Sequence, residues 1–326
     1  MLCPACAESE GQMIRRHSVT AAAEHFVPRE RDRERHDALV DHLRALWAQD
    51  HVEVHVCPLC RFGYAVPFVG GGADFYALAY AGDPHYPRDR WEFGRTLVAL
   101  KQPEFAGRLH VLEIGAGHGA FLDRVRGLGE HEIAAADYDQ GAVRRLCEKG
   151  YDAIAGSIRD VSTTGYDVVC CFQTLEHMAD LDQVFRDLRR VLAPSGSVFV
   201  SVPNGEATAL QESVTGFWDM PPNHVGRWNP TAIRRASERR GFAVRVIETE
   251  PVSTARTAWQ LAVYSVNSRS YVAGTLDNRI NAIEHRPVRG ILKRMLAGTH
   301  LPHLLWIRDQ FRPRTCWAHL CSDRPA

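Results

Sequence analysis

A glycine-rich segment carries the clearest chemistry in the sequence. Residues 111–121 read VLEIGAGHGAF, an apolar run followed by closely spaced glycines and a helical pattern. Glycines let the backbone approach a ligand closely, and the N-terminus of the following helix offers unpaired N–H groups. Asp137 follows Glu113 by 24 residues, where its carboxylate could accept hydrogen bonds from both hydroxyls of a ribose. The segment therefore predicts a site for a cofactor that contains a nucleoside.

Two classes of cofactor fit this spacing. Gly115, Gly117 and Ala120 satisfy a dinucleotide fingerprint, which would place a nicotinamide cofactor on the turn. Glu113 before the turn and Gly119 within it extend the pattern to E-x-G-x-G-x-G instead. The glycine segment by itself leaves both classes open.

Two Cys-x-x-Cys pairs, Cys3/Cys6 and Cys57/Cys60, have the spacing of metal-binding knuckles. Four thiolates suit a tetrahedral structural zinc and leave no open position for catalysis. The pairs are 50 residues apart, whereas an ordinary ribbon separates them by roughly 15–20, so a helix inserted between them is expected. The alternatives are four reduced thiols that never meet, or His51 or His55 as a substitute ligand.

Composition narrows the class of protein. The chain has 326 residues, with 39 Lys+Arg, 39 Asp+Glu and a formal net charge of zero. This balance disfavours a nucleic acid or an anionic membrane as partner. No apolar run approaches the roughly 18 residues of a membrane span, and the first residues do not resemble a signal peptide. Nine cysteines without a secretory signal favour reduced thiols, so we expect a cytoplasmic protein.

From residue 108 onward the sequence alternates between strand and helix patterns. Such repetition is typical of an α/β fold with a doubly wound, mostly parallel sheet. The expected strands are 108–114, 132–137, 151–155, 166–172, 197–202, 243–248 and 316–321. The expected domains are a zinc-ribbon-like, four-cysteine unit at 1–70 with a helix at 30–49, a helical lid at 71–107, and the sheet domain at 108–326 with a helical insertion at about 253–312.

Two further motifs follow the glycine segment in order. Residues 166–178 read YDVVCCFQTLEHM, and residues 187–204 read DLRRVLAPSGSVFVSVPN. With the glycine turn, they make residues 108–250 resemble class I S-adenosylmethionine-dependent methyltransferases. The resemblance implies a Rossmann-like seven-stranded sheet whose last strand is antiparallel, S-adenosylmethionine as cofactor, and methyl transfer as the reaction.

The resemblance also implies the cofactor contacts. Backbone at the turn would pass under the methionine and ribose, an acid would hold the ribose, and the end of the fourth strand would face the methionine. These residues are Glu113, Gly115, Gly117, Asp137, Tyr138, Ser157, Ile158, Phe172 and Gln173. Ser157 departs from the Asp that many members place at the adenine edge. Phe172 is equally well explained by core packing.

The acceptor site is expected after the fourth and fifth strands. Residues 218–228 read WDMPPNHVGRW and resemble the PPHH…RW segment of methyltransferases with an N-terminal zinc ribbon, with Asn223 in place of the first histidine. His177 or His224 could remove a proton from a hydroxyl or amine, since histidine titrates near neutrality. The candidate catalytic residues are His177, His224 and Glu176. The candidate substrate contacts are Tyr76, Tyr80, Tyr86, Trp91, Arg227 and Trp228.

Three functions follow from these motifs. The first is methyl transfer to a small-molecule acceptor, in specialised natural-product metabolism. The second is the same fold used for cyclisation or elimination, with His118, Ser157 or a lid carboxylate (Asp74, Asp83 or Asp89) taking part. The third is a non-catalytic subunit, and for any of them a homodimer or an accessory protein partner is conceivable. The complete glycine turn and Asp137 disfavour the third.

Overall fold

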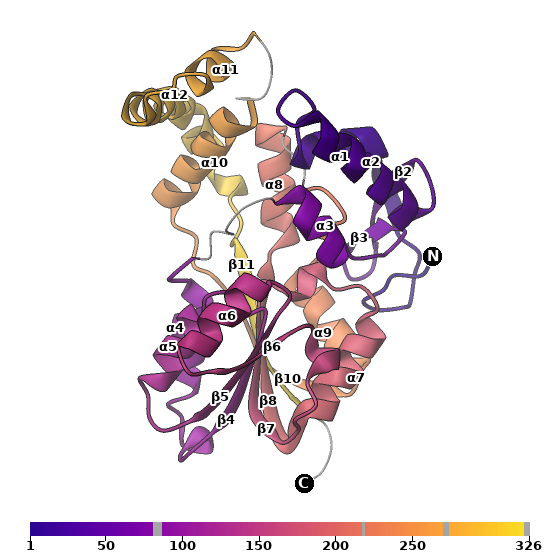
Figure 1. The fold of residues 1–326 in the computed structure, drawn as a ribbon, viewed down its shortest axis with the longest axis vertical. Helices are drawn as coiled ribbons and strands as arrows, with labels where there is room; N and C mark the ends of the chain where they lie inside the picture. The colour runs from indigo at the N-terminus through magenta and orange to yellow at the C-terminus, as the bar shows by residue number, and fades with distance from the viewer. Residues whose placement is uncertain (81–86, 217–218, 270–273, 323–326) are drawn as a thin grey trace. The chain divides into compact units, whose positions relative to one another are not determined.

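The computed structural model describes residues 1–80, 87–216, 219–269 and 274–322 (Figure 1). The chain forms two compact units. Unit 1 comprises Met1–Pro203, Met220–Glu248 and Thr315–Ala326, and unit 2 comprises Asn204–Asp219 and Thr249–Arg314.

A seven-stranded sheet is the centre of unit 1, with the strand order β10-β11-β8-β7-β4-β5-β6 (Figure 1). The strands are β4 (His110–Ile114), β5 (Glu132–Asp137), β6 (Asp152–Ala155), β7 (Tyr166–Phe172), β8 (Leu192–Pro203), β10 (Phe242–Thr249) and β11 (Thr315–Ser322). Strand β11 pairs antiparallel with β8, whereas β8, β7, β4, β5 and β6 pair in parallel. The predicted doubly wound sheet with an antiparallel last strand is confirmed.

Helices cover both faces of this sheet, and they are α4 (Trp91–Ala99), α5 (Ala120–Arg126), α6 (Gln140–Glu148), α7 (Leu181–Val191) and α9 (Pro230–Glu238). Alternate residues of β4 belong to opposite hydrophobic clusters, since successive side chains of a strand point to opposite faces. Val111 packs in the cluster that holds α4, α5 and α6 residues. Leu112 packs in the cluster that holds α7 and α9 residues.

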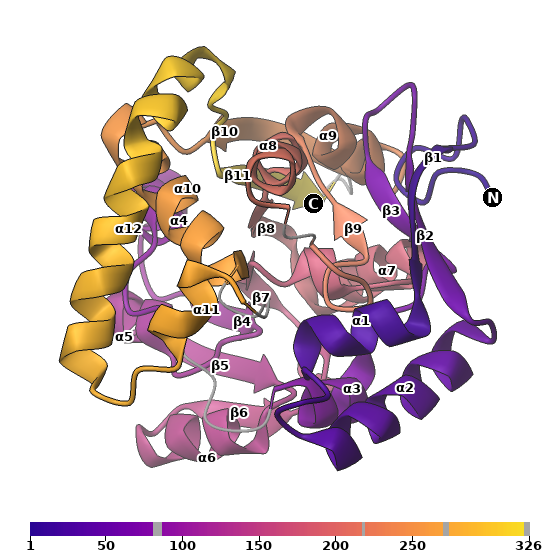
Figure 2. The same cartoon turned by 90° about the horizontal axis from the view of Figure 1, so that it is seen from above.

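A second, four-stranded sheet has the order β1-β2-β3-β9. Its strands are β1 (Gln12–Ser18), β2 (His51–Val56), β3 (Gly63–Val66) and β9 (Gly226–Arg227). The predicted helix at 30–49 is α2 (Arg33–Trp47), which buries Leu39, Leu43 and Trp47. Helices α1 (Val19–Phe26) and α3 (Gly72–Ala79) pack against α2 (Figure 2). Strand β9 comes from the segment after the fifth strand of the large sheet and pairs with β3.

Unit 2 is helical and consists of α8 (Gly205–Thr215), α10 (Thr254–Arg269), α11 (Leu276–Asn281), α12 (Arg286–Trp306) and a 3-10 turn, Arg308–Gln310. Its core joins Ala258, Leu261 and Ala262 of α10 to Ala297 and Leu304 of α12. Figure 2 shows α12 running beside α10 and α11. Across the part of the chain that is described, no helix combines the length and apolarity needed to cross a membrane.

Candidate functional site

The glycine turn connects β4 to α5. Gly115, the first residue of the turn, has φ 72°, a left-handed backbone that glycine adopts without strain. A Cβ at this position would lie 2.6 Å from the Thr174 hydroxyl oxygen, so the turn passes directly under the end of β7. Both features require glycine at position 115, and they leave bare backbone facing the edge of the sheet.

Asp137 ends the neighbouring strand, β5, and its carboxylate is fixed in place. One oxygen (Oδ2) accepts a hydrogen bond from the Gly117 amide at 2.7 Å, and the other (Oδ1) accepts from the Asp139 amide at 2.8 Å. Burial raises the pKa of this carboxyl, while the two backbone hydrogen bonds act to lower it. Each oxygen retains a second lone pair that can accept a hydroxyl.

Glu113 is a buried acid at the end of β4. Its Oε2 atom has no hydrogen-bond partner among the described residues. Burial raises the pKa of Glu113 well above its usual value, and the nearby Asp137 carboxylate adds to the effect. Buried polar atoms nearly always have a partner, so this oxygen marks a place where a bound group or a water molecule can donate a hydrogen bond.

Gln173 belongs to a polar network at the ends of β7 and β8. Its amide nitrogen donates to Glu92 Oε1 at 3.2 Å and to Ser201 Oγ at 3.3 Å, and Ser201 Oγ donates to the same Glu92 oxygen at 3.2 Å. Glu92 is buried and belongs to α4. Glu92 was not predicted from the sequence because it lies outside the motifs, and its only signal was an acid in an aromatic segment.

The other predicted cofactor contacts have different surroundings. Tyr138 is exposed next to Asp137. Ser157 caps a 3-10 turn, since its hydroxyl donates to Asp160 at 2.9 Å and accepts from the Arg159 amide. Ile158 and Phe172 are buried, and the Phe172 ring packs 4.8 Å from that of Phe121 (centroid to centroid). The packing interpretation of Phe172 therefore has direct support.

The predicted catalytic residues Glu176, His177 and His224 come together although they lie up to 48 positions apart. Their ligand-type atoms all lie within 4.8 Å of one another. The two imidazole rings are 4.7 Å apart, centroid to centroid, and His177 Nε2 lies 4.0 Å from Glu176 Oε1. Glu176, His177 and His224 could therefore exchange a proton with one another. One nitrogen or oxygen atom from each could also bind a cation together.

One hydrogen bond determines which nitrogen of His177 is basic. Its Nδ1 lies 2.7 Å from the Asn223 carbonyl oxygen, which can only accept, so Nδ1 carries the proton. The basic lone pair is then on Nε2, the atom that faces Glu176. The Tyr76 hydroxyl lies 3.0 Å from the same Nδ1, and burial raises the pKa of Tyr76. Thus α3, the turn after β7 and the segment before β9 meet at one imidazole.

The remaining candidate substrate contacts differ in how far they are exposed to solvent. Tyr80 is exposed and stacks on Tyr76, with 6.0 Å between ring centroids, and Trp91 is partly buried at the start of α4. Arg227 and Trp228 are buried, and the Trp228 ring packs 4.6 Å from Phe62 in the core of unit 1.

Of the lid acids, Asp74 is exposed on α3, and Asp89 forms an ion pair with Arg124 at 2.9 Å. Tyr86, Asp83 and Trp218 lie outside the described residues.

Comparison with known families decides the assignment of the sheet domain. Residues 88–246 match the family model described as "Methyltransferase domain". This match, which covers just under half of the chain, identifies residues 88–246 as a methyltransferase domain. Its glycine turn, strand order and antiparallel last strand all agree with this family, so the predicted nicotinamide alternative is set aside.

Curated relatives match part of this chain over part of their own length. The ubiquinone biosynthesis O-methyltransferase of Chelativorans sp. (strain BNC1) is 30% identical over 165 residues, 48% of this chain and 60% of the relative. The enzyme of that name from Thiobacillus denitrificans is 29% identical over 138 residues, 40% of this chain and 56% of the relative. The chain thus spans less than two thirds of these relatives. A solved S-adenosylmethionine-dependent methyltransferase from Mesorhizobium loti has a TM-score of 0.44 and 14% identity, covering 72% of this chain and all of that one.

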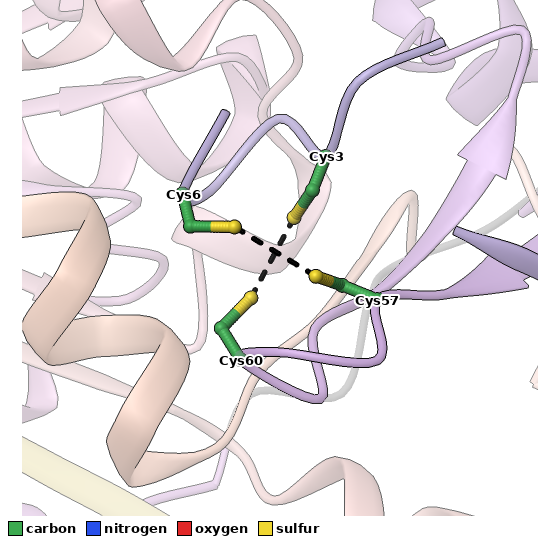
Figure 3. A group of neighbouring side chains, drawn as sticks. All are labelled: Cys3, Cys6, Cys57 and Cys60. Carbon is green, nitrogen blue, oxygen red and sulfur yellow. Dashed lines mark hydrogen bonds between the residues drawn. The ribbon is translucent and has the colours of Figure 1, made fainter. Parts of the chain in front are cut away.

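The four cysteines of the two knuckles meet in unit 1, at one end of the four-stranded sheet (Figure 3). All four are buried, and their sulfur atoms lie within 4.8 Å of one another. Across the knuckles, the Cys3 and Cys60 sulfurs are 3.6 Å apart and the Cys6 and Cys57 sulfurs are 3.7 Å apart. A tetrahedron with Zn–S bonds of about 2.3 Å has S–S edges of about 3.8 Å. The cysteine arrangement therefore fits a zinc ion.

The knuckles are bonded to the methyltransferase domain. Asn229 donates from its amide nitrogen to the Cys60 carbonyl at 3.1 Å, while its side-chain oxygen caps α9. Arg240 donates to the carbonyls of Pro4 and Ala5 at 2.8 and 3.1 Å. Strand β3 pairs with β9, and Val225 directly precedes β9. The Val225 amide donates to the carbonyl of Glu176, one of the predicted catalytic residues, at 2.9 Å.

Proposed function

We propose that this chain transfers a methyl group from S-adenosylmethionine to a small-molecule acceptor. The observation that carries the proposal is that the glycine turn and the histidine cluster follow adjacent parallel strands. Ile114 of β4 pairs with Cys171 of β7, so the turn after β4 and the residues after β7 lie at the same edge of the sheet. A methyl donor on the turn and an acceptor at the histidines would therefore be neighbours, as in-line transfer requires.

For the cofactor, we propose the nine residues that the resemblance implies, in unequal roles. Asp137 would hold the ribose hydroxyls and Tyr138 would lie beside the adenine, with Ser157 and Ile158 at its edge. Gly115 and Gly117 would lie under the ribose and methionine. Glu113 and Gln173 would contact the methionine end, and Phe172 would support that end by packing. When bound, S-adenosylmethionine supplies an electrophilic methyl group, so the protein has to position it and to receive any proton lost by the acceptor.

For the acceptor, we propose that His177 or His224 receives this proton. The Asn223 carbonyl orients His177 so that Nε2 is basic, and Glu176 would stabilise the imidazolium that forms. Tyr76, Tyr80 and Trp91 would line the approach. We assign Trp228 to packing because it is buried against Phe62, and Arg227 to the sheet beside it.

A hydroxyl group is the first acceptor to test. Both curated relatives described above are named O-methyltransferases, which favours oxygen over nitrogen or carbon. Specialised metabolism, a cytoplasmic location and a homodimer or accessory partner stay predictions from the sequence. We further propose that Cys3, Cys6, Cys57 and Cys60 hold a structural zinc, because their sulfur spacing fits its tetrahedron.

Calorimetric titration with S-adenosylmethionine and S-adenosylhomocysteine tests the proposal. We expect micromolar binding that Asp137→Ala weakens about 10- to 100-fold, since charge-assisted hydrogen bonds to the ribose are lost. Asp152→Ala is the matched control, because Asp152 is an exposed acid on the adjacent strand β6. Absence of binding by folded, zinc-loaded protein would refute methyl transfer and favour the fold used for another reaction.

A further inference from the structure

Helix α12 has a row of exposed apolar side chains on one side, three in its first half and one at its last residue. Val288, Ile291, Met295 and Trp306 are 44%, 57%, 66% and 78% exposed. Their spacing of three, four and eleven residues places them on one side of a helix. Ala297 and Leu304 lie on the opposite side and are buried in the core of unit 2. The row extends about 27 Å, at about 1.5 Å per residue.

Exposed apolar side chains are concentrated in unit 2 as a whole. Of the nineteen large apolar side chains that are exposed among the described residues, nine belong to unit 2, and five of these are on α12. Single exposed apolar residues need no explanation, but several on one side of a helix, three of them within about two turns, indicate a binding surface.

The formal charge is unevenly distributed along the chain, although it sums to zero. Residues 249–314 contain ten Lys and Arg and four Asp and Glu, a formal charge of +6, so the rest of the chain carries −6. Helix α12 itself has four basic residues and no acidic one. Its Lys293 donates to the Asn281 side chain at 2.8 Å and its Arg289 to the Ile283 carbonyl at 3.1 Å. These hydrogen-bond partners are neutral, and Asp277 is the acid that interacts electrostatically with Lys293.

We propose that α12 lies in the plane of an anionic lipid membrane surface. Its apolar row would enter the boundary between headgroups and acyl chains, and Arg289 and Arg294, which flank the row, would contact the phosphates. The neutral total charge predicted no membrane partner, but binding depends on the local charge of α12. A second copy paired in parallel is a poorer occupant, because the basic residues all lie between Arg286 and Arg294 and would meet; an antiparallel second copy is an outcome of the test.

Vesicle co-sedimentation tests the proposal with the full-length protein. We expect binding to vesicles of phosphatidylcholine with about 30% phosphatidylglycerol, and much weaker binding to phosphatidylcholine alone or at high salt. Met295→Glu should weaken the binding at least tenfold, because it places a carboxylate in the centre of the row. Met13→Glu is the matched control, since Met13 is 51% exposed on β1 and outside unit 2.

Three results would overturn the proposal. The first is absence of binding to the anionic vesicles, and the second is equal loss for Met295→Glu and Met13→Glu. The third is a dimer in sedimentation velocity that Met295→Glu dissociates, which would identify a second copy as the occupant. An unchanged thermal transition of unit 2 in Met295→Glu shows that the variant is folded there, and vesicle binding does not depend on methyl transfer.

Discussion

At the residue scale, the buried carboxyl of Glu113 lowers the stability of the folded protein. Its carboxyl is buried, one oxygen has no partner among the described residues, and its pKa is raised well above the usual value. The folded state therefore binds a proton more tightly than the unfolded state does. Consequently the free energy of unfolding falls as the pH rises from the unfolded pKa, near 4.5, towards the folded pKa.

Glu113→Gln should remove this dependence and raise stability above neutral pH. We expect a higher melting temperature at pH 8, by about 2–4 °C for each kcal/mol recovered, and a weaker affinity for S-adenosylhomocysteine. Thermal unfolding between pH 5 and pH 9 measures the first effect and calorimetry the second. Glu130→Gln, at an exposed position, is the control. A melting temperature that keeps its pH dependence in Glu113→Gln would refute the argument.

The two histidines give a second prediction at this scale. If either is the base, its replacement by alanine should lower kcat about 10²- to 10⁴-fold while the S-adenosylhomocysteine affinity stays unchanged. Tyr76→Phe should cost less than tenfold, because the Asn223 carbonyl still orients His177. Steady-state kinetics with the identified acceptor measures this, with His303→Ala on α12 as the control. Turnover within tenfold of the wild type in both histidine variants would show that neither is the base.

Sequence reasoning reached some of these residues and not others, for physical reasons. Glu113, Gly115 and Asp137 were predictable because a ligand-binding turn limits residue type at fixed spacing. Glu92 was not, since its partners Gln173 and Ser201 come from strands about 80 and 110 residues away. Trp228 was predicted to line the acceptor site but is buried against Phe62. Aromatic residues suit both binding and packing, so residue type alone could not distinguish them.

At the element scale, β9 connects the cysteine knuckles to the acceptor residues. Strand β3 begins three residues after Cys60 and pairs with β9, and the Ala65 amide donates to the Val225 carbonyl at 2.9 Å. His224 immediately precedes Val225. A disturbance of the knuckles should therefore reach His224 through main-chain hydrogen bonds, while the glycine turn on β4 is unaffected.

Cys60→Ser tests this connection. We expect loss of bound zinc, faster amide hydrogen exchange at residues 224–227, and kcat lowered more than tenfold, with S-adenosylhomocysteine affinity within about threefold of the wild type. Zinc content by mass spectrometry and exchange at peptide resolution are the readouts. Cys147→Ser is the control, because Cys147 is exposed on α6. Unchanged exchange at 224–227 in zinc-free protein would contradict the connection.

The elements themselves were predictable to different degrees. All seven strands of the large sheet were located, and the central parallel strands β4, β5, β7 and β8 are largely buried and form apolar runs between turns. Strand β1 was missed because only His17 among its seven residues is buried, so its sequence shows no alternation. Strand β9 has two residues, and its pairing with β3 spans about 160 positions. Such a pairing depends on tertiary structure and leaves no local pattern.

At the scale of the whole molecule, the two units have separate cores and should unfold separately. Leu304→Ala should lower the free energy of unfolding of unit 2 alone, and Leu188→Ala that of unit 1 alone. We expect a loss of about 2–5 kcal/mol in each case, because each leucine is buried in the core of its own unit. S-adenosylhomocysteine at 100 times its Kd should stabilise only the transition of unit 1, by about 2.7 kcal/mol. Differential scanning calorimetry measures all three. A single transition that every change shifts would show one cooperative unit.

The strand order has a consequence for protein synthesis. Strand β11 pairs with β8, and β10 pairs in turn with β11. Since β11 begins at Thr315, neither strand can join the sheet until the ribosome has made residues 204–314. Until then the nascent sheet ends at β8, whose apolar strand (Val198, Val200, Val202) has unpaired backbone groups that can join another chain. Premature termination in unit 2 should thus release aggregation-prone chains, and chaperones that hold the emerging chain should matter most in that interval.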